Sequence, residues 1–144
     1  MKQNYKTLSL GLKDNILEKT IITLPETHDA TLCLRLTGMI TPEDFTEFFG
    51  DPVYRLTDTY GYYNLYIYYD PAFEGWSREA ADLSFKCISQ CSPKARRLAY
   101  INAPDSRMLM MKMLSPMMHA ETKFFEDSEK DTALQWVLAY QHKE

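Results

Sequence analysis

Glycine, paired cysteine and recognisable catalytic motifs are what this chain has least of. Only five of its 144 residues are glycine, and no glycine-rich loop that could cradle a phosphate occurs. The three cysteines, Cys33, Cys87 and Cys91, are an odd number, which predicts reduced thiols rather than a disulfide framework. Cys87 and Cys91 would share a helix face, but a metal site there would need ligands from elsewhere, so buried thiols are the simpler interpretation.

Signatures of catalysis and of membrane insertion are also missing. The chain contains no Gly-x-Ser-x-Gly and no His-Glu-x-x-His motif, so we expect a non-enzymatic protein that uses no cofactor and no metal. No segment approaches the roughly 18 apolar residues of a transmembrane helix, and we expect no secretory signal. Together with unpaired cysteines, this predicts a cytoplasmic location. The net charge of −4 disfavours nucleic acid as a partner, because nonspecific binding to it needs a basic face.

The order of predicted elements places the chain in the α/β class. A length of 144 residues fits one domain spanning 1–144. Two opening strands joined by a short loop indicate an antiparallel pair, whereas the alternating strands and helices that follow require parallel strands. The prediction is a mostly parallel sheet of about five strands, with an antiparallel N-terminal strand pair and about four helices. The expected strands are 16–24, 31–40, 63–69, 97–101 and 122–125, with a short one at 7–12 before them.

Helix boundaries follow from capping residues and from proline. Thr41-Pro42 begins a helix that Gly50-Asp51-Pro52 is expected to break, with a second short helical piece after it. Further helices are expected at 78–91, at 106–113 and after Ser128. The last helix should turn three apolar side chains toward the core, namely Leu134, Val137 and Leu138.

The segment from Asp70 to Ser77 is the most informative part of the chain. Asp70-Pro71 is expected to end the strand before it, because proline has no amide hydrogen for the sheet. Gly75 would permit a sharp turn, and Ser77 is placed to cap the helix that follows. Open α/β folds form their binding crevices where a helix begins just after the carboxyl end of a strand. Trp76, with Phe73 nearby, would either seal this helix onto the sheet or form one side of a pocket.

Methionine is concentrated in one expected helix and the turn after it. Residues 108–118 contain six of the eight methionines, among them Met108, Met111 and Met117. A flexible thioether suits both gap filling in a core and a deformable wall around an apolar ligand. Both interpretations therefore stand for this segment, as does a dimer contact.

Tyrosine is concentrated in and just before the strand 63–69. Strand alternation puts Tyr66 and Tyr68 on one face of the sheet and Tyr63, Ile67 and Tyr69 on the other. Their hydroxyls could rim an apolar cavity and bind a polar headgroup. Alternatively, the tyrosines are large strand formers whose hydroxyls reach solvent or backbone carbonyls.

Short motifs along the chain resemble the bacterial SpoIIAA-like proteins of the STAS superfamily, a group also described as STAS/SEC14-type domains. They occur in the family's order between about Leu32 and Leu138, which is most of the chain. The matching residues are Gly38-Met39-Ile40-Thr41-Pro42-Glu43-Asp44-Phe45, Gly75-Trp76 with Ala80, Asp82, Leu83 and Phe85, Arg97-Leu98-Ala99, Phe124-Phe125, and Ala133-Leu134-Gln135-Trp136-Val137.

The resemblance implies two kinds of function. STAS domains of anti-sigma-factor antagonists bind a partner kinase and are switched by phosphorylation of a serine at the start of the second helix. SEC14-like relatives hold lipids in an apolar cavity beside the sheet, and SpoIIAA-like proteins are regarded as carriers of nonpolar ligands. The antagonists have Asp-Ser-Ser-Gly at the switch, whereas this chain has Glu74-Gly75-Trp76-Ser77. Only Ser77 remains as a phosphorylation site, and a capping role would already engage its hydroxyl.

We therefore expect a non-enzymatic domain that binds a small nonpolar or lipid-like ligand by hydrophobic burial. The alternative is a STAS-type protein-interaction module that lacks the usual phosphoserine. Ligand binding predicts an enclosed cavity, whereas partner binding predicts an exposed apolar patch around Trp76 and the helix 78–91. The apolar excess also fits a homodimer. The expected ligand contacts are Tyr66, Tyr68, Phe73, Trp76, Met108, Met111 and Met117.

Overall fold

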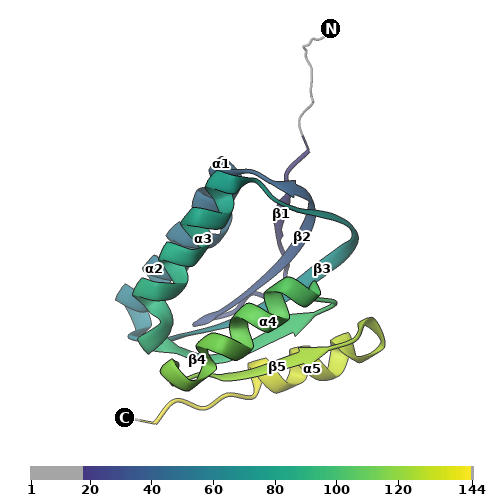
Figure 1. Ribbon diagram of the computed structural model, residues 1–144. Coiled ribbons are helices and arrows are strands. Elements are labelled where there is room, and N and C mark those ends of the chain that lie inside the picture. The colour runs from purple at the N-terminus through teal and green to yellow at the C-terminus, as the bar shows by residue number, and fades with distance from the viewer. Residues whose placement is uncertain (1–17, 144) are drawn as a thin grey trace, which may run out of the picture.

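A five-stranded sheet forms the centre of the computed structural model, which describes residues 18–143 (Figure 1). β1 (Ile21–Thr23) runs antiparallel to β2 (Thr31–Ile40), and all later neighbours are parallel. The remaining strands, β3 (Tyr63–Trp76), β4 (Ala95–Ile101) and β5 (Glu121–Phe125), follow in sequence order across the sheet. This arrangement confirms the predicted α/β class with its antiparallel N-terminal pair.

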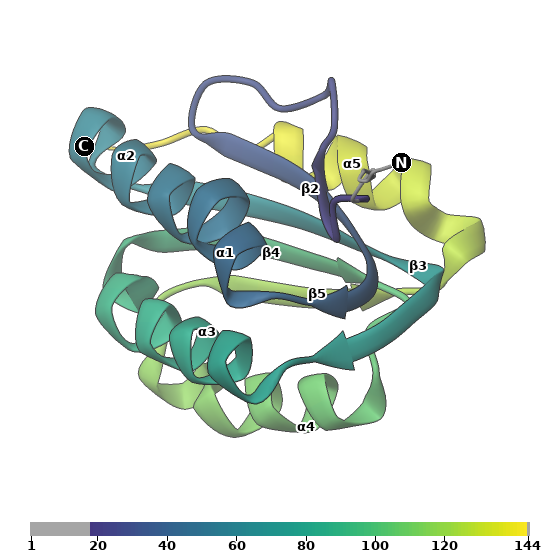
Figure 2. The same ribbon diagram turned by 90° about the horizontal axis from the view of Figure 1, so that it is seen from above.

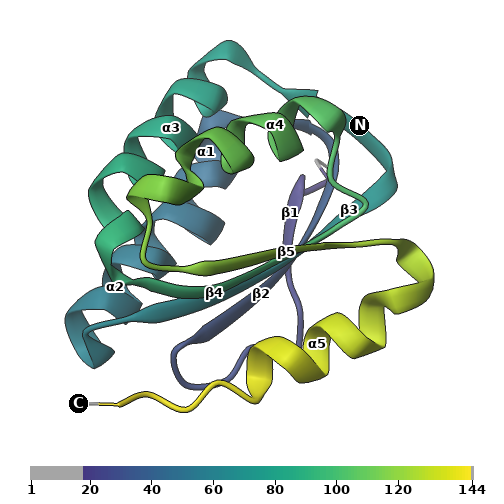
Figure 3. The ribbon, with the colours of Figure 1, turned by 60° about the horizontal axis from the view of Figure 1, so that its bottom comes forward.

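Helices cover both faces of the sheet unequally. Four of them lie on one face and the last one lies alone on the other (Figures 2 and 3). The first face carries α1 (Pro42–Phe45), α2 (Asp51–Tyr60), α3 (Arg78–Cys91) and α4 (Asp105–Leu114), and the second carries α5 (Lys130–Leu138). Among the described residues, none of these helices is both long and apolar enough to cross a bilayer.

The expected helix break at Gly50-Asp51-Pro52 is wrong. A π-helical turn, Thr46–Gly50, joins α1 to α2, and Gly50 keeps helical dihedral angles of −63° and −56°. Pro52 lies in the first turn of α2, where the lack of an amide hydrogen costs little. The start of the helical run is as predicted, since the Thr41 hydroxyl accepts a hydrogen bond from the amide of Asp44 at 3.1 Å.

The expected end of the third strand at Asp70-Pro71 is also wrong, because β3 continues to Trp76. Its pairing with β2 shifts instead: Tyr69 pairs with Leu36, and Phe73 pairs with Gly38. The β3 segment between these pairs is two residues longer than the facing β2 segment, so an irregularity in the ladder accommodates the proline. Gly75 has a φ of +136°, a value that side chains disfavour, and it lies within β3, one residue before the strand ends at Trp76.

Three further expectations concern the ends of the chain. The strand expected at 16–24 is confined to Ile21–Thr23 within the described residues. The short strand expected at 7–12 lies outside the residues that the structure describes. In α5, Ala133 and Val137 are buried, but Leu138 is exposed, so its predicted orientation toward the core is wrong.

The sheet divides the core into two clusters. Alternation along β3 sends Tyr63, Leu65, Ile67 and Tyr69 to the larger cluster, beneath α1 to α4. It sends Tyr66 to the smaller cluster beneath α5, as predicted. Any site on one face is therefore separated from the other face by the full thickness of the sheet.

Candidate functional site

A surface cleft lies where the end of β3 meets the first turn of α4. Its volume is about 530 Å³, which falls within the range of about 300–1,000 Å³ typical of small-molecule sites. The cleft is therefore at the carboxyl edge of the sheet, where a parallel α/β fold places its binding crevices. Its lining includes Phe73, Gly75, Trp76, Ser106, Arg107 and Met110.

Trp76 forms the wall between this cleft and the core. Its ring lies edge-on to Phe45 and Phe73, at centroid distances of 6.1 and 6.4 Å. Phe45 in turn stacks on Phe49 at 4.9 Å, so an aromatic row connects β3 to the first helices. Trp76 remains half-buried, and it both seals the interior and faces the cleft.

Ser77 caps α3, as its position in the sequence predicted. Its hydroxyl accepts a hydrogen bond from the amide of Ala80 at 3.1 Å. Its own amide donates to the carbonyl of Ile40 at 3.0 Å, which ties the start of α3 to the end of β2. The hydroxyl of Ser77, the serine that remains near this helix start, is therefore engaged in capping the helix.

Behind Trp76 lies an enclosed cavity of about 20 Å³. A cavity needs about 10–15 Å³ to hold one water molecule, so this space is of that size rather than the size of a lipid tail. Its walls include Met111, Tyr69 and Tyr100, and burial raises the pKa of both tyrosines. The interior between the sheet and α3 and α4 is thus closely filled.

Arg107 joins the cavity to the cleft, because its side chain lines both. The centre of its guanidinium lies 4.7 Å from the centroid of the Trp76 ring. A guanidinium N–H donates to the hydroxyl of Ser84 on α3 at 3.4 Å. Sequence reasoning missed Arg107, although its spacing of four residues from Met111 places both on the same side of α4.

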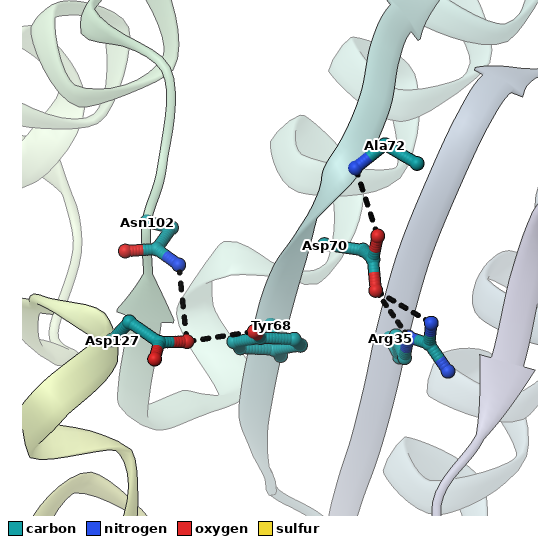
Figure 4. A network of polar contacts seen from close by, with 6 residues as sticks. All are labelled: Arg35, Tyr68, Asp70, Ala72, Asn102 and Asp127. Atoms are coloured by element: carbon teal, nitrogen blue, oxygen red, sulfur yellow. Dashed lines mark hydrogen bonds and ion pairs between the residues drawn. The ribbon is translucent and has the colours of Figure 1, made fainter.

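The opposite face of the sheet carries a polar network at the same carboxyl edge (Figure 4). The guanidinium of Arg35 donates to the carboxylate of Asp70 at 2.8 Å, and the amide of Ala72 donates to the same carboxylate. These two contacts, the amide first, lower the pKa of Asp70. Asp127, in the short 3-10 turn before α5, accepts hydrogen bonds through its carboxylate from the hydroxyl of Tyr68 at 2.7 Å and from the side-chain amide of Asn102 at 3.4 Å.

Tyr66 and Tyr68 line a separate groove of about 380 Å³ on this second face, together with side chains of α5. The hydroxyl of Tyr66 donates to the carbonyl of Lys130 at 3.4 Å. Hydrogen bonding to Asp127 and partial burial raise the pKa of Tyr68. Both hydroxyls thus have protein partners, and both lie across the sheet from Trp76 and Met111.

The seven expected ligand contacts do not meet at one place. Phe73 and Trp76 line the cleft, and Met111 lines the small cavity behind it. Met108 is half-buried on α4. The side chain of Met117 lies outside the described part of the structure.

Three of the large exposed apolar side chains lie on α3 and α4, on the first face of the sheet. Phe85 of α3 is 55% exposed, and Leu109 and Met113 of α4 are 62% and 70% exposed. These helices lie next to each other in Figures 2 and 3, and the contact between Ser84 and Arg107 joins them. We call these three residues the α3–α4 apolar face.

Metal-binding groups do not converge in the described residues: between residues 18 and 143, no three His, Cys, Asp or Glu side chains are placed to hold an ion. Burial raises the pKa of the Cys33 and Cys87 thiols to about 12, so both remain protonated at neutral pH.

Comparison with known proteins agrees with the fold and with the motifs. Searches of curated proteins and of solved structures found no match. The SpoIIAA-like family model matches residues 31–138, from the start of β2 to the end of α5. The match covers three quarters of the chain and every parallel strand, and the chain therefore belongs to the SpoIIAA-like family.

Proposed function

We propose that this domain is a STAS-type interaction module that binds a protein partner through the α3–α4 apolar face. The observation that carries the proposal is the exposure of Phe85, Leu109 and Met113 on two adjacent helices. Large apolar side chains exposed on neighbouring helices favour an interaction surface, because covering them removes apolar area from water. Membership of the SpoIIAA-like family supports this class of function, since STAS domains commonly bind protein partners.

Carriage of a lipid-like ligand in the core receives less support. The enclosed cavity behind Trp76 is about 20 Å³, whereas small-molecule sites occupy about 300–1,000 Å³. Opening a larger space would require Met111, which is fully buried, to leave the core. Partner binding requires no such rearrangement.

Regulation by phosphorylation of Ser77 also receives less support than constitutive binding. A phosphate there would have to replace the hydrogen bond that caps α3. Partner binding through the α3–α4 apolar face does not depend on that serine. We therefore expect Ser77→Ala to bind a partner as well as the wild type does, once its folding is allowed for.

Quantitative co-purification from the host cell tests the proposal. The double variant Phe85→Ser/Leu109→Ser should lose specific partners that the wild type retains, because it removes much of the apolar face. Leu138→Ser is the matched control, because Leu138 is 41% exposed but lies on α5, across the sheet. Equal recovery of every partner by the double variant and the wild type would contradict the proposal.

Two further measurements separate the alternatives. A second copy of this chain is one candidate partner, and a mass by analytical ultracentrifugation that falls from dimer to monomer in the double variant would identify it. Native mass spectrometry of gently purified protein, with solvent extraction, would detect a carried lipid. A bound lipid that is retained by the double variant but lost in Met111→Lys would favour the carrier interpretation instead.

A further inference from the structure

Arg107 is a partly buried cation in aromatic surroundings. It lies over the face of Trp76 and beside the Tyr69 hydroxyl, whose pKa it lowers against the effect of burial. Its side chain is half-buried between the small cavity and the cleft. Taking a guanidinium partly out of water costs free energy, which is normally offset by a carboxylate or another anion.

Among the described residues, no carboxylate lies within ion-pair distance of Arg107. The ion pairs found within 18–143 join Arg35 to Asp70, Arg97 to Glu121 and His28 to Asp29, and none includes Arg107. The groups beside the guanidinium are the hydroxyls of Ser84 and Tyr69, which are neutral acceptors. Since a guanidinium has five N–H donors, Arg107 retains donors and a positive charge for a further group.

The cleft beside Arg107 has the size and lining for that group. Phe73, Trp76 and Met110 provide apolar walls, and Ser106 adds a hydroxyl. Glu74 is the one carboxylate in the lining within the described residues, and it is exposed at the rim. The cleft also borders the first turn of α4, whose helix dipole adds to the positive potential without itself making a site.

We infer that the cleft binds a small organic anion, with its oxyanion on Arg107 and its apolar part against Phe73 and Trp76. A phosphate or carboxylate would accept two parallel hydrogen bonds from the guanidinium, the geometry that arginine favours. An aromatic or aliphatic body would cover the apolar walls. This inference goes beyond the proposed function, since the cleft lies at the sheet edge and includes none of the α3–α4 apolar face.

Tryptophan fluorescence provides a direct test, because the chain has two tryptophans and only Trp76 lines the cleft. In a Trp136→Phe background, phenyl phosphate should change the emission saturably, whereas the neutral benzyl alcohol should not. Inorganic phosphate should bind at least tenfold more weakly, because it lacks the apolar part. Arg107→Gln should weaken phenyl phosphate binding by about tenfold or more, the effect expected for losing a charge-assisted hydrogen bond.

Two variants keep the test decisive if Arg107→Gln folds poorly. Glu74→Gln removes the negative charge from the rim, so it should strengthen phenyl phosphate binding severalfold. Arg55→Gln, an exposed arginine on α2 that lines a different pocket, should leave binding unchanged. Absence of saturable binding, unaltered affinity in well-folded Arg107→Gln, or equal responses to benzyl alcohol and phenyl phosphate would each overturn the inference.

Discussion

Ser77 links the end of β2 to the start of α3. Its amide is bonded to the end of β2 and its hydroxyl to the first turn of α3, so the helix begins at a defined point beside the cleft. A serine at this position satisfies one of the backbone amides that a helix start leaves without a partner. The same hydroxyl cannot accept a phosphate without giving up this role.

Replacement of Ser77 should therefore affect stability before it affects binding. Ser77→Ala removes the cap, and we expect the free energy of unfolding to fall by about 1 kcal/mol. Ser77→Asp supplies another capping oxygen and a charge that the helix dipole favours, so its stability should stay close to that of the wild type. Urea denaturation followed by circular dichroism measures both. Equal stability of the alanine variant and the wild type would show that the hydrogen bond contributes little.

The role of Ser77 could be predicted from the sequence, whereas that of Arg107 could not. Capping depends on residues three apart, so Ser77 could be predicted from local spacing alone. The surroundings of Arg107 come from Trp76 on β3 and Ser84 on α3, which only the tertiary fold brings together. The same limit explains why Tyr66 and Trp76 were predicted to contact one ligand. Their separation by the sheet is a property of the tertiary fold.

At the scale of elements, α4 has two different sides despite its uniform methionine content. Met111 is buried in the larger core cluster, whereas Met113 is 70% exposed. The abundance of methionine in this segment indicated core filling, a deformable wall around an apolar ligand, or a dimer contact. In the structure, α4 contributes Met111 to the core and Leu109 and Met113 to the exposed apolar face. Whether a given methionine is buried or exposed depends on the rotation of the helix about its axis. The nearly uniform apolar sequence does not determine that rotation.

A matched pair of substitutions in α4 tests this division. Met111→Ala should destabilise the domain by about 2–5 kcal/mol, because it leaves a cavity in a packed core. Met113→Ala should change stability by no more than about 0.5 kcal/mol, as expected for a surface position. Thermal and urea unfolding of the two variants provide the comparison. Similar losses in both would mean that α4 packs with a different rotation.

The boundaries of the strands could also be predicted from the sequence only in part. β2 was predicted in full, because its alternating apolar residues lie between clear punctuation at both ends. β3 was predicted too short, because Pro71 usually ends a strand. Its continuation to Trp76 depends on shifted pairing with β2, and pairing between segments distant in the sequence has no local signal.

For the whole molecule, burial of weakly acidic groups on both sides of the sheet sets its behaviour in alkali. Burial raises the pKa of Cys87 in the larger cluster, and of Cys33 and Tyr66 in the smaller one, to about 12. The ordinary values are 9.0 for the thiols and 10.0 for the phenol. In this range the folded protein therefore holds protons that the unfolded chain releases.

The sign of the pH dependence follows from that difference. Stability contributed by these groups is fully present below about pH 9 and is lost as the pH rises from about 9 toward 12, because the unfolded state then binds fewer protons. Urea midpoints measured at intervals from pH 8 to pH 11 should fall steadily above pH 9. Cys87→Ala removes one titrating group and should make the decline shallower. A midpoint that stays constant to pH 11 would contradict the assignment.

The five strands lie in the sheet in the same order as in the sequence. Each strand consequently pairs with the one made immediately before it, and none has to be inserted between two that are already joined. Pairings between segments close in sequence form quickly, and chains begin to fold from the end that is synthesised first. A nascent chain emerging from the ribosome can thus extend the sheet by one strand at a time, so that synthesis and assembly proceed in the same direction.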